Sequence, residues 1–62
     1  MFVIWLKLER GFYNGLIDHK DNFIGLSKDL LEARTLSEEE AKNICLELDE
    51  MKKAYCVLKI VK

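Results

Sequence analysis

The stretch Arg10-Gly11-Phe12-Tyr13-Asn14-Gly15 decides how this chain folds, because it contains two candidate tight turns. Asn-Gly is the strongest short signal for a hairpin turn. A turn at Asn14-Gly15, however, would pair residues 9–11 with 18–20 and leave the apolar part of the first strand unused. A turn at Arg10-Gly11 uses the whole first strand. We therefore expect the hairpin to close there, by a type I turn with Gly11 in the left-handed region beside a bulge.

This choice of turn predicts which side chains share each face of the hairpin, since opposed residues in an antiparallel pair point to the same side. One face is expected to carry the pairs Leu8/Tyr13, Ile4/Ile17 and Phe2/His19. The other face is expected to carry Glu9/Phe12, Lys7/Asn14, Trp5/Leu16 and Val3/Asp18. In this register Asn14-Gly15 forms a bend inside the second strand.

The middle of the chain predicts an edge strand and two helical segments. Phe23 to Leu26 is a short apolar run after a polar loop, as in an edge strand. Ser27 is a cap for one or two helical turns that reach Arg34. Ser37 and Glu40 form a capping box that begins a helix over about 38–52. The buried stripe of that helix is expected to comprise Ala41, Ile44, Cys45 and Leu48, with Met51 or Lys52 at its end.

The last strand, residues 55–61, completes a single α+β domain over residues 1–62. Its alternation places Cys56, Leu58 and Ile60 on one face and Tyr55, Val57, Lys59 and Val61 on the other. The order β-β-(β)-short helix-α-β predicts a small antiparallel sheet of three to four strands with one amphipathic helix packed on one face. We expect that helix to cover Phe2, Ile4, Leu6, Leu8, Ile17, Leu58 and Ile60.

One helix cannot cover both faces of a sheet, so the second face is the first candidate interaction site. It is expected to expose an apolar, aromatic patch, the kind that marks an interface. Its residues are Val3, Trp5, Phe12, Leu16, Tyr55, Val57 and Val61. This patch predicts a homodimer, unless residues 23–31 fold across it instead. A chain this short hides only about 60% of its surface on folding, so a second copy would also add stability.

The second candidate interaction site is an acidic helix surface formed by Glu38, Glu39, Glu40 and Glu47. Capping already explains the first three of these glutamates, because carboxylates in a first helical turn favour the helix dipole. No metal ion is proposed for them. The three glutamates of the first turn are therefore explained by helix capping, and binding of a partner is the second role considered for this surface.

Little in the sequence points to catalysis, and we expect no enzyme, no cofactor and no metal site. His19 is the single histidine and is expected at a strand end, facing solvent or packed at an edge. Cys45 and Cys56 lie in apolar patterns and are expected to be buried thiols rather than nucleophiles or ligands. The N-terminal apolar run is too short to span a membrane and lacks a secretory leader, which indicates a cytoplasmic protein.

A nucleic-acid-binding or transcription-modulating role is the alternative. Lys7, Arg10 and Arg34, with Lys20 and Lys28, could surround a platform of Trp5, Phe12 and Tyr13 on which bases stack. The formal net charge of −1 weighs against this alternative, because phosphate binding favours a basic chain. A protein partner is therefore preferred.

The whole pattern resembles small accessory proteins of phages and prophages of Gram-positive bacteria. The resemblance rests on a short apolar strand, a turn ending in Gly11-Phe12-Tyr13, the run Leu30 to Arg34 and the run Ser37 to Ala41 before a last strand. It implies a protein that binds and blocks a host or defence protein in the host cytoplasm, as anti-CRISPR and related anti-defence proteins do, commonly as a dimer. It carries over no functional residues.

Overall fold

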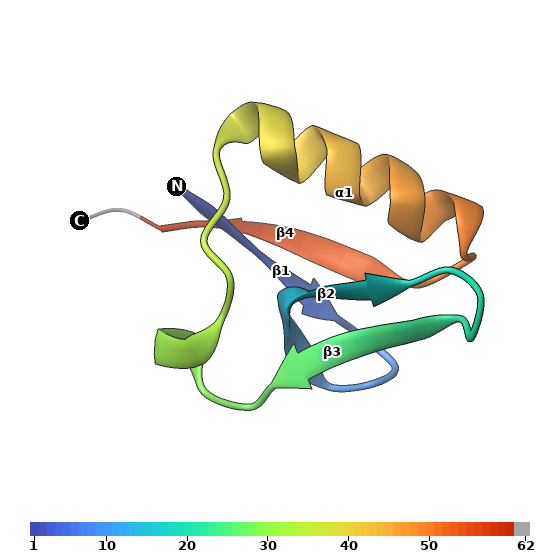
Figure 1. Ribbon diagram of the computed structural model, residues 1–62. Helices are drawn as coiled ribbons and strands as arrows, with labels where there is room; N and C mark the ends of the chain where they lie inside the picture. Colours follow the sequence, from blue (N-terminus) through green and yellow to red (C-terminus); the bar gives the residue numbers. More distant parts are fainter. Residues whose placement is uncertain (61–62) are drawn as a thin grey trace.

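The computed structural model describes residues 1–60 and has four strands and one long helix. The strands form one antiparallel sheet in the order β3-β2-β1-β4, and α1 lies on one face of it (Figure 1). The elements are β1 (Phe2–Leu6), β2 (Gly11–Asp18), β3 (Phe23–Ser27), a 3-10 turn η1 (Leu30–Glu32), α1 (Glu38–Glu50) and β4 (Tyr55–Lys59). The predicted α+β class and element order are confirmed, with Phe23 to Leu26 inside the edge strand β3.

The first hairpin turns earlier than predicted. Residues 7–10 form the turn, and the Arg10 N–H donates to the Leu6 carbonyl oxygen over 2.8 Å. Arg10, not Gly11, takes the left-handed conformation, with φ 57°. Gly11 is needed for another reason, since a Cβ there would lie 2.9 Å from the Leu26 Cβ.

The predicted register between β1 and β2 is therefore wrong, because each residue of β1 pairs four positions earlier in β2 than expected. Trp5 lies opposite Phe12 and not opposite Leu16. Because the shift is an even number, Trp5 and Phe12 still share a face. Leu8, expected beneath the helix, instead lies in the turn and is 81% exposed.

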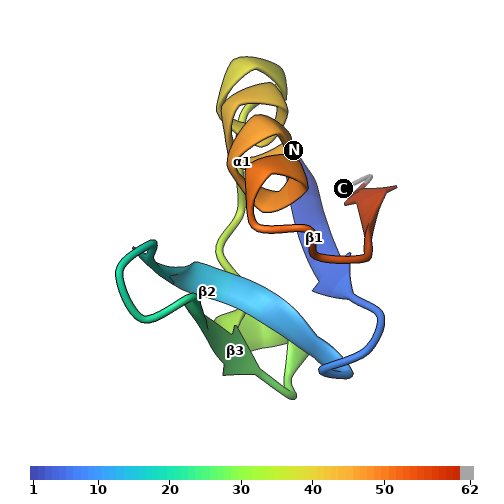
Figure 2. The same ribbon diagram turned by 90° about the vertical axis from the view of Figure 1, so that its right-hand side faces the viewer.

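The second candidate turn, Asn14-Gly15, is a bend within β2, as predicted. The pairing with β3 shifts between Tyr13 and Ile17, which marks a bulge, and Gly15 has φ 107°. Beyond this point the β2–β3 ribbon bends away from β1, as Figure 2 shows. The sheet is therefore continuous across its four strands only near the end of β1.

The segment after β3 occupies the space that the diverging strands leave. The Arg34 N–H donates to the Tyr13 carbonyl oxygen over 2.9 Å, and Leu36 exchanges two backbone hydrogen bonds with Phe2. Asp29 caps the 3-10 turn, whereas Ser27, the predicted cap, ends β3 with its hydroxyl 3.1 Å from the Asp29 carbonyl oxygen. This segment does not bury Leu31, which is 91% exposed.

The long helix α1 begins as predicted and ends slightly earlier. The Ser37 hydroxyl accepts from the Glu40 N–H, and the Glu40 carboxylate accepts from the Ser37 N–H, so the capping box is complete. The helix stops at Glu50 because Lys52 takes φ 58°, and the Lys53 N–H then donates back to the Leu48 carbonyl oxygen. This pattern is a Schellman motif with lysine in the usual glycine position.

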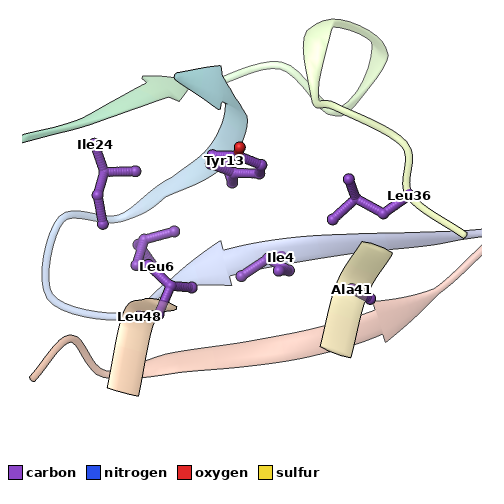
Figure 3. Packing of buried hydrophobic residues seen from close by; sticks show 7 residues of the cluster. All are labelled: Ile4, Leu6, Tyr13, Ile24, Leu36, Ala41 and Leu48. Atoms are coloured by element: carbon purple, nitrogen blue, oxygen red, sulfur yellow. The ribbon is translucent and has the colours of Figure 1, made fainter. Parts of the chain in front are cut away.

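The core lies between α1, β1 and the β2–β3 ribbon (Figure 3). Ala41 and Leu48 are buried in it, and Ile44, Cys45 and Met51 pack against it, so the predicted helix stripe is confirmed. The buried residues of the core are Ile4, Leu6, Tyr13, Ile24, Leu36, Ala41 and Leu48.

The faces of the last strand are opposite to those predicted. Val57 lies opposite Ile4 and Tyr55 opposite Leu6, which puts Tyr55 and Val57 on the helix side. Cys56 and Leu58 share the other side with Trp5 and Val3. The alternation alone could not decide this orientation, because β4 is apolar on both faces.

Candidate functional site

The sheet face opposite α1 carries a row of side chains that crosses all four strands. We call it the outer face and define it by Trp5, Phe12, Leu16, Cys56 and Leu58. Trp5 pairs with Phe12 on one side and with Cys56 on the other, and Phe12 pairs with Ser27. The Trp5 and Phe12 rings meet edge to face. Figure 2 shows α1 on the opposite side of β1.

Two leucines extend the outer face beyond this row. Leu58 is 41% exposed and Leu16 is exposed as well. Leu16 belongs to the outer face because a Cβ on Gly25, which would point away from the buried Ile24, would lie 2.9 Å from the Leu16 Cβ. The outer face therefore offers a half-buried aromatic pair, an exposed leucine on β4 and another further along β2.

The predicted second-face residues do not all lie together. Trp5, Phe12 and Leu16 lie on the outer face, whereas Val3 is on the same side of β1 but is only 1% exposed. Tyr55 and Val57 lie on the helix side, as described above. Val61 lies outside the described residues.

The helix side has an apolar groove that the sequence did not indicate. It is an open cavity of about 450 Å³ between α1 and β4. Its lining residues are Phe2, Glu38, Ala41, Lys42, Cys45, Leu46 and Val57. Leu46 is 63% exposed and Val57 is 40% exposed, so apolar side chains remain open to solvent there. Leu46 could have indicated the groove from the sequence, since it is an apolar residue that lies outside the predicted buried stripe of the helix.

The groove borders a strand edge that has unused backbone groups. Ile60 donates to Met1 and Lys7 donates to Ala54, so alternate residues of β4, Cys56 and Leu58 among them, point their backbone groups at β1. The N–H and C=O groups of Tyr55, Val57 and Lys59 therefore point away from β1. Among residues 1–60, no strand pairs with this edge (Figure 1).

The four predicted acidic residues of the helix do not form one surface. Glu38 lies beside the groove, 3.9 Å from the Lys42 Nζ. Glu47 lies nine positions, or two and a half turns, further along and contacts His19 of the β2–β3 loop, with 3.3 Å between the Glu47 Oε1 and the His19 Nε2. Glu40 is engaged in the capping box, and this hydrogen bonding to the Ser37 backbone lowers the pKa of its carboxyl. Only Glu39 has no such contact among those described.

The aromatic residues proposed for base stacking are separated by the sheet. Tyr13 is 5% exposed and belongs to the core, whereas Trp5 and Phe12 lie on the outer face. The cations are dispersed as well, since Arg10 lies in the first turn and Lys20 in the β2–β3 loop. The platform of three aromatic residues is therefore not formed.

A small polar cluster links α1 to β4 at the far end of the groove. The Tyr55 hydroxyl donates to the Asp49 Oδ1 over 3.0 Å, which raises the pKa of Tyr55 to about 12. Burial raises the pKa of the neighbouring Cys45 thiol. A protonated thiol and a protonated phenol at neutral pH are poor nucleophiles. The cluster acts as a structural contact between helix and strand.

Within residues 1–60, no three His, Cys, Asp or Glu side chains converge as metal ligands would. The same residues include no helix long and apolar enough to cross a membrane. Comparison with protein-family models, with curated proteins and with solved structures found no match.

Proposed function

We propose that the chain is a non-enzymatic protein-interaction module that binds an apolar patch of a partner protein through its outer face. The observation that carries this proposal is the row of Phe12, Trp5 and Cys56, with exposed Leu58 on β4 and exposed Leu16 further along β2. Aromatic anchors beside exposed aliphatic side chains are typical of the energetic centre of an interface. The long helix α1 does not cover this face, because it lies on the other side of the sheet (Figure 2).

The target class follows from the sequence resemblance. We propose that the module inhibits or modulates a host or defence protein, and that it does so in the cytoplasm of a Gram-positive host. The dispersed cations and the buried Tyr13 favour a protein target over nucleic acid.

Quantitative affinity capture from a Gram-positive host lysate tests the proposal with a matched pair of variants. Leu16→Glu places a charge on the outer face, and Leu31→Glu places the same charge on η1, where the leucine is 91% exposed. Both variants should fold, since neither leucine is buried. We expect Leu16→Glu to lose the captured protein and Leu31→Glu to keep it.

A second variant separates a protein partner from nucleic acid. Lys7→Glu/Arg10→Glu reverses two charges in the first turn. If capture survives Leu16→Glu but is lost with this double variant, and falls steeply with salt, the chain binds nucleic acid and the proposed function is wrong.

A further inference from the structure

The free edge of β4 has the pattern of a strand that pairs with its own copy. We propose that a second copy of the chain adds to this edge, antiparallel and centred on Val57, which joins two four-stranded sheets into one. This interface is separate from the outer face proposed for the partner protein. It also differs from the dimer interface expected from the sequence, which involved Trp5.

The backbone geometry of β4 allows this pairing without rearrangement. The N–H and C=O groups of Tyr55, Val57 and Lys59 point to the free edge at every second residue, as an antiparallel partner requires. A two-fold axis at Val57 would pair Val57 with the partner's Val57 through two hydrogen bonds. Tyr55 would then lie opposite the partner's Lys59.

The side chains of β4 are complementary to themselves in this register. Val57 would meet its own copy on the helix side, and Cys56 would meet the partner's Leu58 on the other side. Lys59 is the one charged residue of β4 and would lie opposite an aromatic ring rather than another lysine. The register therefore pairs no like charges, which are destabilising when directly opposed.

The apolar groove supports the same arrangement. A two-fold axis perpendicular to the sheet places both copies of α1 on the same side of the joined sheet. The two grooves then face each other, with Leu46 and Val57 of each copy beside the joint. Pairing would remove from solvent two side chains that a single chain leaves 63% and 40% exposed.

The opposite edge of the sheet has no exposed apolar side chain at the centre of its strand, and the exposed Phe23 lies at the end of β3. In β3, Ile24 is buried, and Gly25 offers no side chain to a neighbouring strand. Its last residue, Ser27, turns its hydroxyl to Asp29 and Glu32 of its own chain. The edge of β4 is therefore the one that a second copy fits.

Cysteine cross-linking tests the register directly. Val57→Cys, in a Cys45→Ala/Cys56→Ala background, would place two cysteines in a hydrogen-bonded pair with Cα atoms about 5.5 Å apart, within disulfide range. We expect rapid oxidation to a covalent dimer. Lys59→Cys in the same background is the matched control, because a two-fold axis at Val57 places its copies roughly 14 Å apart. Equal cross-linking of the two variants would overturn the proposed register.

Light scattering after size exclusion tests the interface itself. Val57→Pro removes an N–H that no residue among 1–60 uses but that the dimer needs twice, so the dissociation constant should rise roughly thirtyfold. Val57→Lys, which opposes two charges at the axis, gives a second test that does not depend on proline fitting the strand. A wild-type chain that stays monomeric at millimolar concentration would overturn the proposal, and so would variants as dimeric as the wild type.

The two proposals fail separately. Leu16→Glu should leave the dimer intact, because Leu16 lies in β2, two strands away from β4. If the wild type is monomeric but Leu16→Glu loses the captured protein, the self-pairing inference is wrong and the proposed function stands. If an unrelated extended peptide, and not a second copy, protects the β4 edge, the self-pairing inference is also wrong.

Discussion

The Trp5 and Phe12 rings lie 4.8 Å apart between centroids at an interplanar angle of 66°, on directly opposed residues of β1 and β2. This edge-to-face contact lies close to the turn, beyond which β2 diverges from β1. It joins the two strands at the last pair before they diverge and forms the centre of the outer face.

We expect the two rings to be energetically coupled. A double-mutant cycle with Trp5→Leu and Phe12→Leu should give an interaction free energy of about 1 kcal/mol, as for other edge-to-face pairs. Urea unfolding of the four proteins measures it. Strictly additive losses would show that the rings contribute only through buried area.

The capping box should make the stability of α1 depend on pH in the acid range. Hydrogen bonding to Ser37 lowers the pKa of the Glu40 carboxyl in the folded state. The stabilisation is therefore fully present above the unfolded carboxyl pKa and is lost as the pH falls through the lower, folded value. Urea unfolding against pH should show a weaker acid dependence for Glu40→Gln than for the wild type.

Ser37→Ala should destabilise the protein by about 1 kcal/mol at neutral pH, since it removes the side-chain acceptor for the Glu40 N–H. Thr35→Ala is a control two residues away, outside the capping box. Equal losses in both variants would show that the capping box adds nothing specific.

Lys52→Gly should stabilise the protein by about 0.5–1 kcal/mol. Lys52 ends α1 with φ 58°, a conformation that glycine adopts without the penalty of a Cβ. The matched control is Lys42→Gly inside the exposed face of α1, which should cost about 1 kcal/mol. Thermal or urea unfolding of both variants should show a higher free energy of unfolding for Lys52→Gly and a lower one for Lys42→Gly. A loss with Lys52→Gly would mean that the lysine side chain makes a stabilising contact of its own.

The contact between Tyr55 and Asp49 should make the protein sensitive to high pH. The hydrogen bond to Asp49 raises the pKa of Tyr55 to about 12 in the folded state. Its contribution is therefore fully present below the unfolded tyrosine pKa and is lost as the pH rises through about 12. Burial raises the pKa of Tyr13 as well.

Tyrosinate absorbance against pH measures this effect. In the folded wild type both tyrosines should ionise above the usual range. Tyr55→Phe should remove the ionisation near pH 12, which belongs to Tyr55. It should also reduce the loss of stability above pH 10, the ordinary tyrosine pKa. Ionisation of Tyr55 at that ordinary value would contradict the contact with Asp49.

The helix could be predicted from the sequence because its signals are local. Ser37 and Glu40 define the start, and the spacing of Ala41, Cys45 and Leu48 defines the buried stripe. The end of the helix was predicted two residues too late. It depends on the left-handed backbone conformation of Lys52, which lysine has no preference to adopt. The edge strand β3 and the bend at Gly15 were also predicted from local signals.

The register of the strands could not be predicted in the same way, because it depends on distant contacts. The turn at residues 7–10 keeps Glu9 within 3.2 Å of Lys53, which lies just before β4. The orientation of β4 is set by the connection through Lys53 and Ala54, whose backbone groups bond to Leu48 and Lys7, while the sequence Tyr55-Cys56-Val57-Leu58 is apolar on both sides. The groove beside Leu46 was missed for the same reason.

Residue-resolved amide hydrogen exchange tests the self-pairing of β4 most directly. The Leu58 N–H faces β1 and should be protected at every protein concentration. The Val57 N–H faces the free edge, so it should be protected in concentrated solution, where the chain pairs, and should exchange rapidly after dilution. A Val57 N–H that exchanges rapidly even where light scattering shows a dimer would contradict pairing through β4 and would place the interface elsewhere.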